Sequence, residues 1–230
     1  MSYEERVNRA IQNKDEKAII SLIEEDIPAS EATVKAKEQA IGGLAQLYVD
    51  QNTPEKIKSI AEKFSDRLSI FSKPRLAKVT KGLVDYIAKV PGSEKLQIEL
   101  SEWMVEWCVR EKRTYLKHRI ELKLAGLLLD VGEPDRATRV IEPILTEVRK
   151  ADDKLLLVEL YLLESKINHR IRNFAKAKAS LTASRANANN VYCQPSLIAE
   201  IDLMSGILYA QDQDYKTSYS YFYEALEPMM

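Results

Sequence analysis

The feature that most constrains the fold is a repeat with a period of about forty residues. Bulky apolar residues recur in helical surroundings, 38 to 41 positions apart, at Leu22, Ile60, Leu100, Ile141, Leu181 and Phe222. We expect each to lie on the second helix of a helix hairpin. A hairpin of this length buries its apolar faces mainly against its neighbours in a stack. The repeat therefore predicts an all-α fold, a right-handed α-solenoid of TPR-like helix hairpins with a period near 40 residues. It is expected to form a single domain over residues 1–230.

The last two repeats carry the clearest packing pattern. Small and aromatic residues alternate in the last one at Gly206, Tyr209, Ser218, Phe222 and Ala225. Four equivalent places about forty residues earlier hold Ser165, Ala177, Leu181 and Ser184. A small residue on the first helix lets the second approach closely, and a bulky side chain on the second fills the groove beside it. These residues are predicted to pack the two helices of each hairpin together.

The composition agrees with helices and disfavours several classes of function. Seven glycines and eight prolines are few for 230 residues, and charged residues make up 30% with a net charge of −1. A protein that binds nucleic acid by releasing counterions from phosphates is usually far more basic. No run approaches the roughly 18 apolar residues that span a bilayer, and the N-terminus has no signal-peptide pattern. We expect a soluble intracellular protein that binds neither nucleic acid nor membrane.

The sequence offers no arrangement of reactive residues that favours catalysis. Cys108 and Cys193 lie too far apart for a metal-binding box, and Cys108 is expected to be a small buried hydrophobe. His118 and His169 have no partner at metal-ligand or relay spacing and are expected at the surface. We therefore predict no enzymatic activity, no metal and no cofactor.

The stretch NFAKAKASLTASRANANNVYC, residues 173–193, permits two opposite interpretations. Its cations could line a nucleic-acid-binding helix, or its alanines could form a close-packing face. At 100° per residue, Lys178, Thr182 and Arg185 share a face separate from the packing positions. In a chain with almost no net charge, we interpret the stretch as a packing helix.

A dense basic cluster lies at the junction between two repeats, in VREKRTYLKHR at residues 109–119. It consists of Arg110, Lys112, Arg113, Lys117 and Arg119. One interpretation is a solvated basic turn. The other is a contact site for an acidic protein partner, because such patches steer association and fix register. An RNA contact would need more aromatic platforms than Tyr115 supplies.

Four long segments resemble a known family. They are EKRTYLKHR (111–119), DDKLLLVELYLLESK (152–166), FAKAKASLTASRANANNVYCQP (174–195) and DLMSGILYAQDQDYKTSYSYFYEALE (202–227). They resemble the family of 26S proteasome non-ATPase regulatory subunit 11, a lid subunit with N-terminal helical repeats and a C-terminal PCI domain. The C-terminal winged-helix portion of that domain is missing here, so we expect a fragment of a longer protein that is monomeric when isolated.

The resemblance implies a non-catalytic scaffold of the regulatory particle lid in ubiquitin-dependent protein degradation, in cytoplasm and nucleus. Its repeat arm would bridge neighbouring lid subunits, the base ATPase ring and the 20S core α-ring. A paralogous signalosome scaffold is a near alternative, and an RNA-contacting scaffold a further one. A TPR-type peptide-binding module is the alternative from another class, although such modules use a shorter repeat of about 34 residues.

Overall fold

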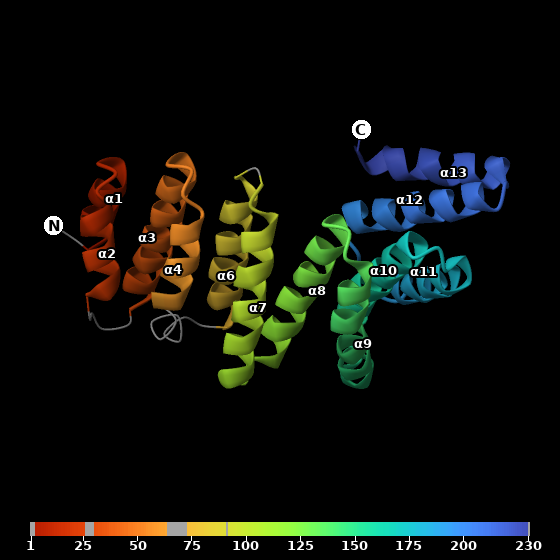
Figure 1. Ribbon diagram of the computed structural model, residues 1–230, viewed down its shortest axis with the longest axis horizontal. Coiled ribbons are helices and arrows are strands. Elements are labelled where there is room, and N and C mark those ends of the chain that lie inside the picture. The colour runs from red at the N-terminus through yellow and green to blue at the C-terminus, as the bar shows by residue number, and fades with distance from the viewer. Residues whose placement is uncertain (1–2, 26–29, 64–72, 91, 230) are drawn as a thin grey trace. The chain divides into compact units, whose positions relative to one another are not determined.

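The structure is a computed structural model that describes residues 3–25, 30–63, 73–90 and 92–229. The all-α prediction is confirmed, because these residues form helices and contain no β-strand (Figure 1). The α-helices are α1 (Tyr3–Gln12), α2 (Glu16–Glu24), α3 (Glu31–Asp50), α4 (Glu55–Lys63), α6 (Lys73–Ala88), α7 (Glu94–Arg110), α8 (Thr114–Asp130), α9 (Pro134–Ala151), α10 (Lys154–Arg170), α11 (Phe174–Ala188), α12 (Pro195–Gln211) and α13 (Tyr215–Leu226). A short 3-10 turn, η1 (Glu227–Met229), follows α13.

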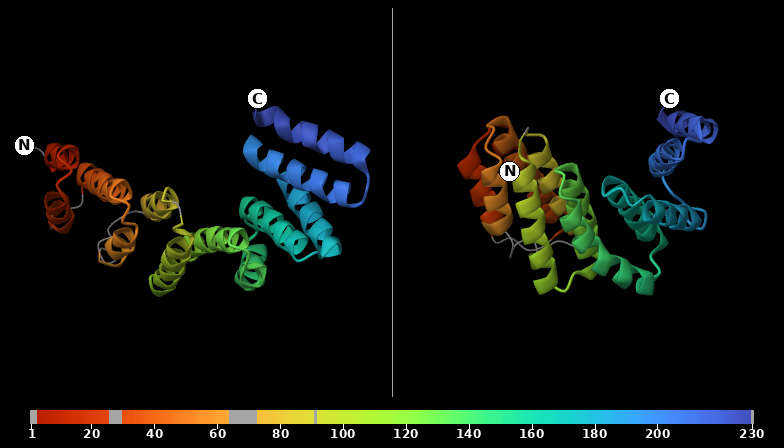
Figure 2. Two further views of the ribbon diagram at one scale, coloured as in Figure 1. Left: turned by 45° about the horizontal axis from the view of Figure 1, so that its top comes forward. Right: turned by 45° about the vertical axis from the view of Figure 1, so that its right-hand side comes forward.

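The helices follow the predicted order of first helix, short turn and second helix. The six recurring apolar residues fall on α2, α4, α7, α9, α11 and α13, which are the second helices of successive hairpins. In each view α12 and α13 run side by side in opposite directions (Figures 1 and 2). The prediction of repeated helix hairpins is therefore confirmed by the helix positions.

A residue in the left-handed backbone conformation lies between the two helices of each hairpin. These residues, again 38 to 41 positions apart, are Lys14, Asn52, Gly92, Gly132, Arg172 and Gln213. In the last hairpin, the backbone N–H of Asp214 then donates to the carbonyl oxygen of Tyr209 at 3.1 Å. Bonds of this kind use carbonyls that a helix end leaves without an intrahelical partner. The turn is thus a second periodic feature of the chain.

The residue that follows this turn residue is often the N-cap of the second helix. The side chains of Asp15, Asn173 and Asp214 each accept a hydrogen bond from the backbone N–H three positions later. Such N-caps satisfy a donor that the first helical turn leaves open. Pro134 instead opens α9, where a missing N–H costs nothing.

The chain divides into two compact units, residues 1–120 and residues 121–230. The first unit buries large aliphatic side chains such as Leu44, Ile57 and Leu83, each at most 2% exposed. The core of the second unit joins α10, α11 and α12 through residues such as Val158 and Ile201. That all 230 residues form one domain stays a prediction.

The predicted packing residues of the second unit lie between paired helices. Ala177, Leu181 and Ala225 are buried, and Phe222 is half-buried against Gly206. Tyr209 is 39% exposed and stacks on Tyr221 with ring centroids 5.4 Å apart.

The three serines of the pattern share one interaction that the sequence did not indicate. Each donates its hydroxyl to a backbone carbonyl of the partner helix at 2.8 Å: Ser165 to Ala177, Ser184 to Val158 and Ser218 to Gly206. A small side chain that also binds the facing backbone fixes the spacing of the two helices.

Candidate partner-contact surface

The predicted basic cluster surrounds the turn between α7 and α8. There the backbone N–H of Arg113 donates to the carbonyl oxygen of Cys108 at 2.9 Å, and Lys112 has a φ of 52°. This left-handed residue reverses the chain within a few positions. As a result, Arg110 and Lys112 are exposed while Cys108 is fully buried.

The five cations of the cluster differ in their surroundings. Arg110 and Lys112 form no ion pair with another residue in the described ranges. The guanidinium of Arg113 lies 5.8 Å from the centroid of the buried Trp107 ring, and its Nε is buried without a hydrogen-bond partner among the described residues. Arg113 is therefore held against the core, whereas Arg110 and Lys112 are free to meet a partner.

The other two cations, on α8, are also engaged. The guanidinium of Arg119 lies 5.7 Å from the centroid of the Tyr115 ring. Lys117 is half-buried and interacts with a neighbour. The structure thus leaves a smaller basic surface than the sequence indicated.

Two exposed apolar side chains flank the free cations. Val109 is 57% exposed and Tyr115 is 60% exposed. Together with Arg110, Glu111 and Lys112 they form what we call the α7–α8 surface. Exposed tyrosine and arginine are enriched where proteins bind proteins. Val109 was not among the predicted contact residues, although an apolar residue directly before four charged ones was an available signal.

Acidic residues of the next hairpin neutralise two cations on the polar face of α11. Lys178 forms a close ion pair with Asp212, and Arg185 contacts Asp202 at 2.6 Å. Thr182 lies on the same face, in a hollow of about 550 Å³ bounded by α11, α12 and α13. Because their acidic partners belong to the protein itself, Lys178 and Arg185 are poorly suited to bind phosphates. This favours the packing-helix interpretation of residues 173–193.

The expectation for the histidines is wrong in one of two cases. His118 is 7% exposed, because it shares a second buried face of α8 with Glu121 and Ala125, three and seven positions later. His169 is half-exposed, with its ring centroid 5.7 Å from that of Phe174. Spacing between histidines says nothing about which helical face each occupies, and burial depends on the face.

The cysteines are poorly suited to nucleophilic chemistry. Cys108 has no exposed surface. Burial, and to a lesser degree the charge of Glu159, raises the pKa of the Cys193 thiol, which disfavours the reactive thiolate. In the part of the chain that the structure describes, no three His, Cys, Asp or Glu side chains are grouped as a metal would require. The same residues include no helix of the length and apolarity that crossing a membrane demands.

Comparison with known proteins matches residues 3–131 to the family model of the 26S proteasome regulatory subunit RPN6 N-terminal domain. The 26S proteasome non-ATPase regulatory subunit 11 homolog of Arabidopsis thaliana is 42% identical over 225 residues, covering 97% of this chain and 54% of that protein. The 26S proteasome regulatory subunit RPN6 of Saccharomyces cerevisiae is 40% identical over 230 residues, covering 96% and 53%. The chain thus spans about half the length of these relatives.

A solved structure is similar in fold. The crystal structure of BtubC (BKLC) from P. vanneervenii aligns with a TM-score of 0.68, covering 100% of this chain and 91% of that one. The two sequences are 15% identical, so this likeness concerns the fold alone.

Proposed function

This chain belongs to the family of the 26S proteasome regulatory subunit RPN6 N-terminal domain, and on that premise we propose that it is a scaffold segment of the proteasome regulatory particle lid. The family match over residues 3–131, together with relatives 40–42% identical, carries the proposal. In this role its helices contact neighbouring lid subunits, the base ATPase ring and the α-ring of the 20S core, in cytoplasm and nucleus. It holds other subunits in place during ubiquitin-dependent protein degradation.

The proposed role is non-catalytic. The name of the Arabidopsis relative places that protein among non-ATPase regulatory subunits. The buried Cys108 and the raised thiol pKa of Cys193 give this chain no ready nucleophile among its cysteines. Binding alone is sufficient for a scaffold, because many modest contacts along a helical array provide specificity.

We assign the α7–α8 surface as one docking site for an acidic partner. It lies within the residues that match the family model. Arg110 and Lys112 supply charge that no described residue neutralises, and Val109 and Tyr115 supply apolar area beside it. An acidic patch with an apolar centre on a core or lid subunit is the complementary surface.

The test uses the purified chain and purified 20S core particles in a co-sedimentation assay. The variant R110E/K112E reverses the two free cations of the α7–α8 surface. The matched control is K150E/R172E. Lys150 lies in the last turn of α9, as Arg110 does in α7, and Arg172 has the left-handed conformation of Lys112. Both pairs are exposed.

We expect the surface variant to bind about tenfold more weakly, since two exposed ion pairs worth roughly 0.2–1 kcal/mol each become repulsive. The control should bind within about twofold of the unmodified chain. Binding should also weaken near 1 M salt, where the Debye length is about 3 Å. If the correctly folded chain does not bind core particles at low salt, the result contradicts the proposed role. Equal loss in both variants contradicts the assignment of the surface.

A further inference from the structure

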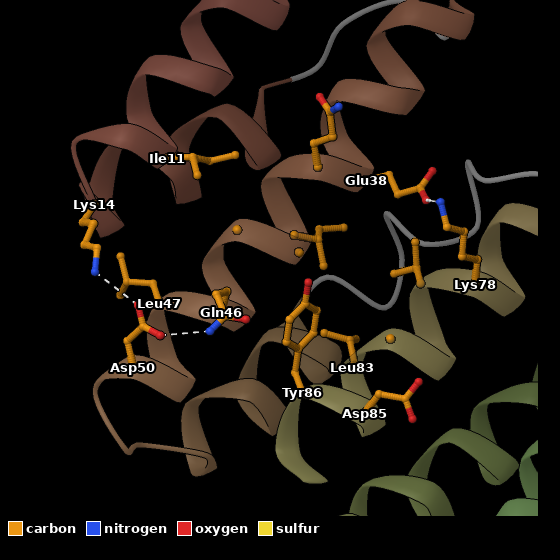
Figure 3. Close-up of a pocket in the computed structure, with 16 residues that line it drawn as sticks. Ile11, Lys14, Glu38, Gln46, Leu47, Asp50, Lys78, Leu83, Asp85 and Tyr86 are labelled. Atoms are coloured by element: carbon orange, nitrogen blue, oxygen red, sulfur yellow. Dashed lines mark hydrogen bonds and ion pairs between the residues drawn. The ribbon is translucent and has the colours of Figure 1, made fainter. Parts of the chain in front are cut away.

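An open hollow lies on the first helices of three successive hairpins, away from the α7–α8 surface. It measures about 700 Å³ and is bounded by α1, α3 and α6 (Figure 3). Its floor is apolar, formed by buried side chains such as Ile41, Val79 and Leu83. Binding pockets of proteins are typically of this size, with an apolar lining and few polar groups.

Three glycines line the hollow, and packing explains one of them. A Cβ at Gly43 would lie 2.8 Å from Ile11, so α1 can approach α3 closely there because this residue is glycine. A Cβ at Gly42 would lie 3.5 Å from the Tyr86 hydroxyl, which is an ordinary contact. A Cβ at Gly82 would meet no atom of the described residues within 4 Å.

Among the described residues, Gly82 therefore has no packing reason to be glycine. A glycine in a helix interior costs about 1 kcal/mol relative to alanine. The φ of Gly82 is outside the left-handed region, so its backbone conformation does not require glycine either. What glycine does provide at this position is open space in the wall of the hollow, where another polypeptide backbone can approach.

The charged groups around the hollow are largely paired with one another. Lys14 contacts Asp50 at 3.1 Å at one end, and Lys78 contacts Glu38 at 2.7 Å at the other (Figure 3). Asp85, on the α6 side, also has a partner. A strongly acidic or basic ligand thus gains little here, whereas a neutral one leaves every pair intact.

The hydroxyl of Tyr86 is a polar group of the hollow that is left without a hydrogen bond among the described residues. The Tyr86 hydroxyl points into the hollow and forms no hydrogen bond to another residue in the described ranges (Figure 3). A backbone N–H or C=O of an extended segment would satisfy it. In its interior a bound helix would offer only carbonyls that already accept one hydrogen bond and no free N–H, so an extended segment satisfies the Tyr86 hydroxyl better.

From these observations we infer that the hollow binds a short, extended and electrically neutral segment of a partner protein. The two ion pairs mark its ends at Glu38 and Asp50 of α3, twelve residues apart. At 1.5 Å per helical residue they are separated by roughly 18 Å, which about five extended residues span. The segment runs past Gly82, donates or accepts a hydrogen bond at Tyr86, and places an apolar side chain on the floor. The inference does not depend on the proposed docking at the α7–α8 surface.

The test uses a displayed library of random seven-residue peptides, from which binders are selected with the full chain as the target. The variant G82L fills the wall of the hollow, and G126L is its matched control. Gly126 also lies within a helix, α8, and its Cβ would likewise meet nothing within 4 Å, but it does not line the hollow.

We expect enriched peptides to be neutral with an apolar residue near the centre, and to bind in the micromolar range. G82L should lose at least tenfold in affinity, G126L less than twofold, and Tyr86→Phe about threefold to tenfold, as for a lost hydrogen bond. In the unmodified chain, photoreactive versions of these peptides should label segments of α3 and α6, which provides a readout independent of variant folding. The inference is overturned by highly charged binders, by peptides that bind G82L undiminished, by labelling elsewhere, or by a selection that yields no binder.

Discussion

The replacement Gly206→Ala tests whether helix pairing in the second unit depends on a side-chain-free position. Gly206 faces the ring of Phe222 across the α12–α13 hairpin. A Cβ on residue 206 would lie 2.6 Å from both Cδ1 and Cε1 of that ring. Carbon atoms in good contact are about 3.5–4.0 Å apart, so the ring must retreat by roughly 1 Å.

Two opposing contributions determine the expected change in stability. Alanine improves helix propensity by about 1 kcal/mol over glycine. Overpacking a well-filled contact costs about 1–3 kcal/mol, and we expect the upper part of that range because two ring atoms are displaced together. The net destabilisation should be about 1–2 kcal/mol, or a decrease in the thermal midpoint of roughly 3–6 °C for a chain of this size.

Urea unfolding followed by circular dichroism measures the total effect, and hydrogen exchange locates it. Exchange is needed because a chain with two compact units need not unfold in one step. Amides of α12 and α13 should lose about tenfold in protection, while those of α10 change little. Gly126→Ala is the control, because its Cβ meets nothing and it should therefore be stabilising.

A double-mutant comparison isolates the contact with the ring. In a Phe222→Ala background the obstacle is gone, so Gly206→Ala should become stabilising by about 1 kcal/mol. The coupling between the two positions is then about 2–3 kcal/mol. If Gly206→Ala stabilises the unmodified chain as much as Gly126→Ala does, the close approach of ring and glycine does not control the pairing of these helices.

Three further predictions concern hydrogen bonds and turns. Ser184→Ala removes the hydroxyl that binds the Val158 carbonyl and should cost about 1 kcal/mol in urea unfolding; no measurable cost would mean the bond is incidental. Burial, and then the hydrogen bond to Glu16, raises the pKa of Tyr48 above its ordinary value of about 10. The contribution of neutral Tyr48 to the stability of the folded protein is therefore complete below pH 10, and it is lost as the pH rises from there towards the folded-state pKa. Tyr48→Phe should therefore cost about 1 kcal/mol at pH 7 and flatten the alkaline part of the stability curve, which a titration of the thermal midpoint would reveal. Arg172→Gly should stabilise by about 0.5–1 kcal/mol, because glycine relieves the left-handed strain of about 1–2 kcal/mol but loses more entropy on folding; a lower midpoint would contradict this reasoning.

The predicted positions of the second helices were accurate because each repeat places a bulky residue at the same point. Leu100, Ile141 and Leu181 are buried on α7, α9 and α11 respectively. Each hairpin of the stack buries an equivalent apolar face, so the sequence pattern of that face repeats along the chain. Fold class could therefore be predicted from periodicity alone.

Three of the six turns could not be predicted in the same way. Three left-handed positions between the helices of a hairpin carry Lys14, Arg172 and Gln213, where glycine would have been the recognisable signal. Asp152 is the left-handed residue that ends α9, and the adjacent Asp153 is the N-cap of α10, although both are the same residue type. Backbone hydrogen bonds and the packing of the flanking helices set these conformations, and neither requires a particular side chain at the turn residue itself.

The candidate surface was predicted in part. Charge density located the α7–α8 turn, but it could not show that Arg113 lies over Trp107 while Arg110 stays free. Nor could it show that Arg185 is paired with an acid of the next hairpin. Both depend on which helical face meets which neighbour, and this follows from tertiary packing rather than from local sequence.

The periodic turn also determines where the chain can be lengthened. Between α10 and α11 it occupies residues 171–173, where the backbone N–H of Asn173 donates to the carbonyl oxygen of Asn168 at 2.8 Å, so one added residue there would disrupt the turn that sets the phase of α11 against α10. The connection from α11 to α12, residues 189–194, lies outside the paired helices and carries no such phase requirement. A short epitope or fluorescent tag inserted at that connection should leave every hairpin intact, and it offers a way to follow the chain in an assembled complex.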